Sequence, residues 1–181
     1  MSFDSAWRSS GLTSFSTPLP TGNIVYAAWR DCSNLVSFTS EINASNVRFS
    51  WYGCSSLTSF STPLSNANRL DYGWRNCTSL TDFSADVFAN WNPSSLVTGM
   101  FDNAWKNTAL TAASVENILV GISNSGKYAT TNGASGGSAL GNAGIDIDYN
   151  VATGSLSAAT NSAIDSLKTK GWSIFINSVE Q

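Results

Sequence analysis

The stretch that decides the fold is WRDCSNLVSF, Trp29 to Phe38. It returns as WYGCSSLTSF at 51–60 and as WRNCTSLTDF at 74–83. A shorter form, WRSSGLTSF, precedes them at 7–15, and a partial form, WKNTAL, follows at 105–110. The first four tryptophans are separated by steps of 22, 22 and 23 residues. A fixed period in the twenties is typical of stacked repeats, in which each turn of the chain packs on its neighbours.

Four residue types keep one register through the three full repeats. Each Cys falls three residues after a Trp, each Leu six after it, and each Phe three after the Leu. Burial of one large apolar side chain is worth ~1.5–3 kcal/mol, so four per turn can hold turns that have little regular structure. We therefore expect four core columns. They are Trp29, Trp51 and Trp74; Cys32, Cys54 and Cys77; Leu35, Leu57 and Leu80; and Phe38, Phe60 and Phe83.

The three cysteines are predicted to be small buried side chains in one column. Adjacent turns lie about one strand spacing apart, ~5 Å, so a neighbouring pair could also form a disulfide. The chain has no His, and thiols stacked on one face do not make a tetrahedron, so no zinc site is expected.

Within each turn, the pattern predicts one short strand followed by a corner. In LTSFSTPL at 57–64, Phe60, Thr62 and Leu64 can share one face, and Ser59 and Ser61 the other. We name the equivalent hydrophilic positions the polar strand face. It could bind sugar hydroxyls or a partner backbone, or only keep the edge soluble. Its members are Ser14, Ser16, Ser37, Thr39, Ser59, Ser61, Asp82 and Ser84.

The predicted domain organisation has two parts. Residues 1–110 form the repeats, with an insertion at 84–104 that lengthens the step from Trp74 to Trp105 to 31 residues. Trp91 in this insertion is expected to pack in an enlarged corner, or alternatively to contact a ligand from an exposed loop. Residues 111–181 are expected to form an α/β cap that shields the end of the stack.

The cap sequence predicts two helices and two strands. Thr111 and Ser157 are suitable N-cap residues, and the apolar residues that follow each of them recur at helical spacing. Gly126 and Gly171 are expected to end these helices. GIDIDYN at 144–150 alternates like a half-exposed strand, and WSIFIN at 172–177 predicts a last strand.

The motif WxxCxxLxxF, followed by a polar pair, Pro and Leu, resembles the bacterial surface-antigen (BspA-like) type of leucine-rich repeat. Trp stands where that family usually has Phe, and Phe where it usually has Ile. Similar Trp-rich versions occur among proteins of marine bacteriophages. The resemblance implies a β-rich leucine-rich-repeat solenoid of about five turns with parallel strands and a C-terminal α/β cap. It also implies a surface or virion binding protein.

No catalytic constellation can be recognised, and we predict neither enzymatic activity nor a cofactor. His is absent, the cysteines are predicted to be buried, and no nucleophile elbow or phosphate-binding loop occurs. Asp146 and Asp148 lie two residues apart on a strand, near the carboxylate separation of glycosidases, but both are expected to face solvent. With Asn150 they also begin a calcium-loop pattern, but Val151 and Ser157 occupy the positions of its Gly and Glu.

Basic residues follow the tryptophans in one column. Arg8, Arg30, Arg75 and Lys106 each come directly after a Trp, whereas Tyr52 takes this place in the third repeat. This basic strip is either a solvated stripe of long side chains or a binding strip for acidic polysaccharide or phosphate groups.

These features together predict a non-enzymatic binding or structural module. The expected setting is a bacteriophage virion, as a tail fibre, receptor-binding or capsid-decoration protein. The alternatives are a bacterial cell-surface adhesin that binds host protein or glycan, and a purely structural self-assembling protein. The net charge of −3 argues against nucleic acid as a partner, and no apolar run has the ~20 residues of a membrane span. The first turn is expected to be open, so other protein chains are predicted to cover it.

Overall fold

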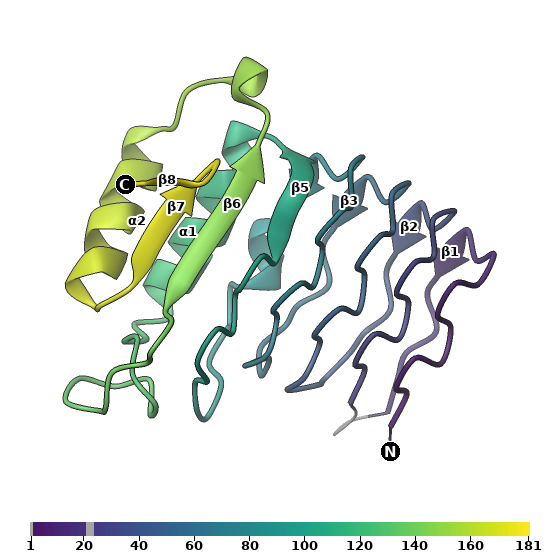
Figure 1. Ribbon diagram of the computed structural model, residues 1–181, viewed down its shortest axis with the longest axis horizontal. Coiled ribbons are helices and arrows are strands. Elements are labelled where there is room, and N and C mark those ends of the chain that lie inside the picture. The colour runs from purple at the N-terminus through teal and green to yellow at the C-terminus, as the bar shows by residue number, and fades with distance from the viewer. Residues whose placement is uncertain (1, 21–23) are drawn as a thin grey trace.

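The computed structural model describes residues 2–20 and 24–181; residue 1 and residues 21–23 of the predicted repeat region lie outside it. Coils of chain lie side by side along the long axis and run into a C-terminal α/β unit (Figure 1). Parallel bridges join Ser2 to Ile24, Ile24 to Asn46, and Asn46 to Arg69. The repeat period of the sequence is therefore the length of one coil.

Each coil begins with a run of turns, which we call the turn segment. The segments are residues 4–9, 26–31, 48–53, 71–76 and 98–104. Alternate N–H groups of one segment donate to carbonyls of the next coil: Ser5 N to Tyr26 O at 2.9 Å and Trp7 N to Ala28 O at 2.8 Å. The intervening N–H groups close turns within the coil, as Arg8 N does on Ser5 O at 3.2 Å. A β-ladder runs in both directions between two strands, whereas these inter-coil bonds all run from one coil to the next.

The backbone of the turn segments explains this one-way pattern. Two residues per segment, four positions apart, adopt positive φ. In the second coil they are Ala27 (51°) and Asp31 (61°), and in the fourth they are Tyr72 (58°) and Asn76 (64°). Left-handed residues interrupt an extended chain, so these segments cannot form strands.

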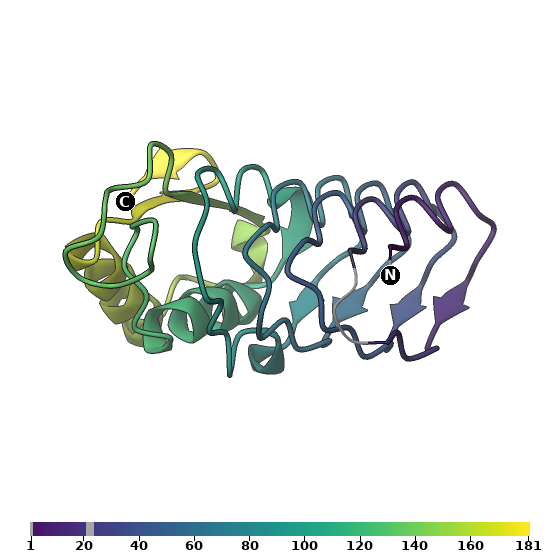
Figure 2. The same cartoon turned by 90° about the horizontal axis from the view of Figure 1, so that it is seen from below.

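Regular strands are short in the first four coils. They are β1 Ser14–Phe15, β2 Ser37–Phe38, β3 Ser59–Phe60 and β4 Asp82–Phe83. β1 pairs in parallel with β2, and β3 with β4, as two separate two-stranded sheets. These strands lie on one long side of the molecule and the turn segments on the other (Figure 2).

The expected leucine-rich-repeat solenoid of five turns with parallel strands is therefore wrong. No continuous sheet runs through the coils in the described part of the chain: the sheets have two, two and four strands. The physical reason is the turn chemistry, because only two residues per coil are extended and paired while the turn segments carry most of the other inter-coil hydrogen bonds.

Aromatic rings fill the interior of the coils. Trp7, Trp29, Trp51, Trp74 and Trp105 stack with ring centroids 5.3, 5.7, 5.3 and 5.6 Å apart and interplanar angles of at most 8°. The Phe rings of β1–β4 stack beside them, 5.6–5.9 Å apart. The Leu column is buried between the coils as well. Burial of these rings supplies the main stabilisation of the coils.

The cysteines lie in the core as free thiols, without a disulfide. Cys54 Sγ donates to Trp29 O at 3.2 Å, and Cys77 Sγ donates to Trp51 O at 3.0 Å. Each thiol thus satisfies a carbonyl of the preceding coil. Burial raises the pKa of the Cys54 and Cys77 thiols well above the usual range of a thiol.

The insertion adds a short helix and more aromatic core. The 3-10 helix η1 spans Ala85–Val87, and Phe88, Met100 and Phe101 are buried beyond it. Trp91 is only 1 % exposed, and its Nε1 donates to Ala67 O at 2.7 Å. The alternative of an exposed ligand contact at Trp91 is therefore wrong, because its ring is needed to close the enlarged corner.

The C-terminal unit is a four-stranded sheet with two helices on one side (Figure 2). In chain order its elements are β5 Trp105–Leu110, α1 Ala112–Asn124, β6 Gly144–Tyr149, η2 Val151–Thr153, α2 Ala158–Thr169, β7 Ser173–Ile176 and β8 Val179–Glu180. The strand order is β5-β6-β7-β8, with only β8 antiparallel. Both predicted helices are confirmed. Their N-caps are Thr111 and Ser157, whose side chains accept from Ser114 N and Thr160 N.

None of the described helices is long and apolar enough to cross a membrane.

Candidate functional site

The turn segments align their side chains into columns across the coils. The basic strip is one of these columns, because Arg8, Arg30, Tyr52, Arg75 and Lys106 each follow a stacked Trp. Arg30, Arg75 and Lys106 are half-buried and Arg8 is exposed. The repeat period therefore brings the predicted strip together on one side of the molecule.

Most of the basic strip is neutralised by neighbouring carboxylates. Asp31 Oδ2 lies 3.8 Å from Arg8 Nε and 3.3 Å from Arg30 Nε, and Lys106 Nζ lies 3.3 Å from Asp148 Oδ1. Within residues 2–20 and 24–181, Arg75 takes part in no ion pair. Such pairing weakens the interpretation of the strip as a site for polyanions.

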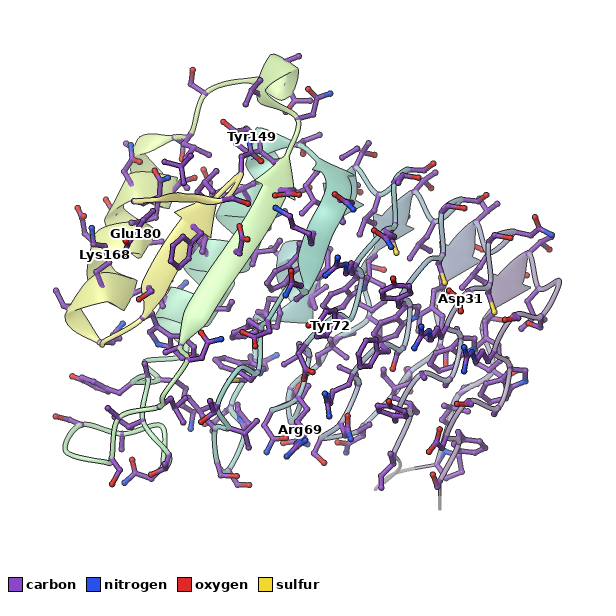
Figure 3. All side chains as sticks on the ribbon, in the orientation of Figure 1. Asp31, Arg69, Tyr72, Tyr149, Lys168 and Glu180 are labelled. Carbon is purple, nitrogen blue, oxygen red and sulfur yellow. The ribbon has the colours of Figure 1, made fainter. Side chains whose placement is uncertain are left out.

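A second set of side chains accompanies the strip in coils two to four. We name it the aromatic–arginine ladder. It consists of Tyr26, Arg30, Arg48, Phe49, Tyr52, Asp71, Tyr72 and Arg75. Tyr72, labelled in Figure 3, lies near the middle of this face.

The rings and guanidinium groups of the ladder cover one another. The Phe49 and Tyr72 rings stack at 4.7 Å with an interplanar angle of 8°. The guanidinium carbon of Arg30 lies 4.7 Å from the Tyr52 ring centroid and 5.3 Å from that of Phe49. Because each group restricts its neighbours, the side chains are held in place before any partner binds.

One ion pair anchors the ladder to the coils. Arg48 Nε donates to Asp71 Oδ2 at 2.5 Å, and Asp71 is 7 % exposed. Burial raises the pKa of Asp71 above its usual range, while the hydrogen bond and charge of Arg48 act in the opposite direction. The pair fixes Arg48 between the Tyr26 and Phe49 rings, 6.0 and 5.6 Å from their centroids.

Two ladder donors have no acceptor among the described residues. Nε of Arg30 and Nε of Arg75 are buried atoms that make no hydrogen bond. For Arg30 the nearby Asp31 oxygen gives an ion pair without a hydrogen bond. Buried donors of this kind are uncommon, and the Nε1 atoms of the stacked Trp29, Trp51, Trp74 and Trp105 share this property.

The polar strand face lies on the opposite side, along β1–β4 (Figure 2). Its side chains are exposed except for Ser84, which is half-buried and caps η1 by accepting from Asp86 N at 3.2 Å. The two predicted surfaces therefore do not form one site.

The outer side of the first coil carries half-buried apolar side chains, including Phe3 and Trp7, whereas Trp29 in the next coil is fully buried. The carbonyls of Asp4, Ala6 and Arg8 accept no hydrogen bond from the described residues, although their counterparts in the second coil do. The expectation that another chain covers this coil stays a prediction.

The two candidate catalytic carboxylates have different environments. Asp148 accepts from Asn107 N at 2.9 Å and pairs with Lys106, whereas Asp146 makes one long contact, from Ser178 N at 3.4 Å. Burial raises the pKa of Asp146, which Lys106 partly opposes. Asp148 is held as a structural carboxylate, so the geometry gives no acid–base pair. The described residues contain no group of three or more potential metal ligands of the types His, Cys, Asp and Glu.

Sequence reasoning found the basic strip but missed most of the ladder. The signal was available, because Phe49 and Tyr72 each stand two residues before a stacked Trp and Arg48 and Asp71 each stand three before it. The same register that located the core columns thus also locates the ladder.

Neither a protein-family model, nor a curated protein, nor a solved structure matches the chain.

Proposed function

We propose that the chain is a non-enzymatic binding module that holds a protein partner on its aromatic–arginine ladder. The observation that carries this proposal is the composition and rigidity of the ladder. Tyr and Arg are enriched at the energetic centres of protein interfaces, and here they are half-exposed and already packed against one another.

The same geometry favours protein over the other expected ligands. The faces of several ladder rings are covered by rings or guanidinium groups, so they offer little platform for a sugar ring. Three of the four basic strip residues are paired with Asp, so a polyanion would find few uncompensated charges. Arg75 can instead donate to carbonyls or a carboxylate of a partner surface.

The test compares capture of proteins from a cell-envelope extract by the chain and by two double variants. Arg75→Gln with Tyr52→Ser removes a cation and a ring from the ladder. Ser37→Gln with Ser59→Gln crowds the polar strand face and is the matched control. A protein retained through the ladder should bind at least about 30-fold more weakly to the ladder variant, since each hot-spot residue contributes ~2 kcal/mol or more. It should bind the control variant normally.

Three results would refute the proposal. Equal retention by the ladder variant would show that the ladder does not bind the partner. Loss of retention only in the strand-face variant would assign binding to the polar strand face. Binding to arrayed glycans that requires Arg75 would make the partner a glycan rather than a protein.

The setting in a virion, with the cell surface as its alternative, stays a prediction that comes from the repeat resemblance. Antibody labelling of purified particles tests it directly.

A further inference from the structure

The hydrogen bonds that join the turn segments of successive coils are interrupted between the last coil and the C-terminal sheet. On one side of the interruption, Gly99 N donates to Asn142 O at 2.8 Å. On the other side, Trp105 pairs with Ile147 at the start of the β5–β6 pairing. Between them, the N–H groups of Phe101 and Asn103 have no acceptor among the described residues. Their counterparts in the fourth coil, Leu70 and Tyr72, both donate to the next coil.

The direction of these two N–H groups follows from the peptide units to which they belong. Met100 O accepts from Leu70 N at 2.9 Å, and Asp102 O accepts from Tyr72 N at 2.8 Å. No described peptide bond is cis, and in a trans peptide the C=O and the following N–H point in opposite directions. The N–H groups of Phe101 and Asn103 therefore point away from the fourth coil, toward β6.

A pocket of about 230 Å³ lies at this interruption. Phe101, Asp102 and Asn103 line it from the last coil, and Asp146 and Phe175 line it from β6 and β7. Its volume is below the ~300 Å³ at which sites for drug-sized ligands begin, so the pocket suits a ligand no larger than one small residue. Phe101 is fully buried, and an orphaned buried N–H is rare in native proteins.

The pocket also offers acceptors and an apolar wall. Asp102 Oδ1 accepts from Asn142 Nδ2 at 2.6 Å and Asp146 Oδ1 from Ser178 N, so the second oxygen of each carboxylate accepts no hydrogen bond from the part of the chain that the structure describes. The Phe175 ring is half-buried. The lining thus combines two N–H donors, two carboxylate oxygens and one aromatic ring, and Asn142, Gly144 and Ser178 complete it.

These groups exclude several classes of ligand. The carboxylates repel an anion, and the two N–H groups repel a metal cation. An ammonium group would satisfy the carboxylates but leave both N–H donors unpaired, which is costly. A neutral ligand that carries a carbonyl, an N–H, hydroxyls and a methyl group satisfies every part of the lining.

We infer that this pocket binds an N-acetylated neutral sugar, with its acetamido oxygen and a hydroxyl on the Phe101 and Asn103 N–H groups. The acetamido N–H and a second hydroxyl donate to Asp102 and Asp146, and the acetamido methyl packs on Phe175. The pocket is separate from the aromatic–arginine ladder, and its test does not depend on the protein partner proposed for that ladder.

The experiment is an amide ¹H–¹⁵N titration of the full chain with N-acetylglucosamine, glucose and glucosamine. N-acetylglucosamine should bind with a Kd on the order of 1 mM and shift the amide protons of Phe101 and Asn103 most. Glucose should bind about tenfold more weakly, because it lacks the acetamido group. Asp146→Asn and Phe175→Ala should each weaken binding about tenfold, whereas Asp165→Asn, an exposed site on α2, should change nothing.

Absence of a saturable shift at Phe101 and Asn103 would overturn the inference. Tighter binding of glucosamine than of N-acetylglucosamine would overturn it too, because it would make the pocket a cation site. If Phe175→Ala does not fold, Asp146→Asn alone decides: unchanged affinity in that variant contradicts the role of the carboxylate.

Discussion

Trp51 occupies the centre of the Trp stack, and its removal should be among the most costly single changes in the protein. It is 0 % exposed, and four rings contact it: those of Trp29, Trp74, Phe38 and Phe60, at 5.7, 5.3, 5.1 and 4.6 Å. Truncation of a buried Trp to Ala costs ~3–5 kcal/mol, and aromatic pairs add ~0.5–1.5 kcal/mol beyond area. We expect Trp51→Ala to lower the free energy of unfolding by about 5 kcal/mol.

Two further substitutions make this prediction specific. Trp7 stands at the end of the Trp stack, where its ring stacks on those of Trp29 and Phe3 but is only half-buried, so Trp7→Ala should cost roughly 1–2 kcal/mol. Trp51→Phe keeps a ring and removes an indole N–H that is buried without a partner. Relief of an unsatisfied donor is worth ~1–3 kcal/mol, which offsets the lost ring area, so Trp51→Phe should cost less than about 1 kcal/mol.

The assay is equilibrium unfolding in urea, followed by far-ultraviolet circular dichroism and fitted for each variant to its own folded and unfolded baselines, because the loss of one stacked Trp changes the signal. The slopes of the transitions should agree among the variants, because the surface exposed on unfolding is nearly the same. Equal losses for Trp7→Ala and Trp51→Ala would refute the reasoning, since that result would mean that Trp51 is no better packed than the ring of the first coil.

Two other predictions concern titratable groups whose pKa is raised by burial. Cys54 and Cys77 should resist thiol reagents in the native protein and react only in denaturant, because burial raises the pKa of both thiols; rapid native labelling would contradict this. Burial, with the charge of Asp71, raises the pKa of Asp102, so its stabilising contribution is complete below about pH 4 and is lost as the pH rises through the folded-state pKa. Asp102→Asn should therefore be more stable than the wild type in urea at about pH 7 and equal to it at about pH 3; the opposite pH dependence would disprove the assignment.

The stacking of the coils could be predicted from the sequence, but the path of the chain around each coil could not. The register of Trp, Cys, Leu and Phe depends only on the period, and the core columns lie where that period places them. The backbone depends on φ at positions such as Asp31 and Tyr72, where no Gly signals a left-handed turn. The side-chain spacing carries no information on these φ angles, and for this reason the leucine-rich-repeat prediction is wrong.

The candidate site, too, could be predicted from the sequence only in part. The basic strip could be predicted because Arg8, Arg30 and Arg75 share one repeat position. Their pairing with Asp could not, because Asp31 contacts two coils at once only when its segment turns back on itself. The pocket could not be predicted either, because it lies where the one-way hydrogen bonds between the coils end and the pairing of β5 with β6 begins.

The one-way hydrogen bonds also give the stack an electrical axis. Each peptide unit has a dipole of about 3.5 D, and the units that join the coils align head to tail, as they do in a helix. The negative end lies at the Asp4, Ala6 and Arg8 carbonyls, and the positive end lies where the Asp148 carboxylate accepts from Asn107 N. The two ends of the coil stack should therefore attract groups of opposite charge, although the net charge of the chain is only −3, and at the β5 end the Asp148 carboxylate already occupies this position.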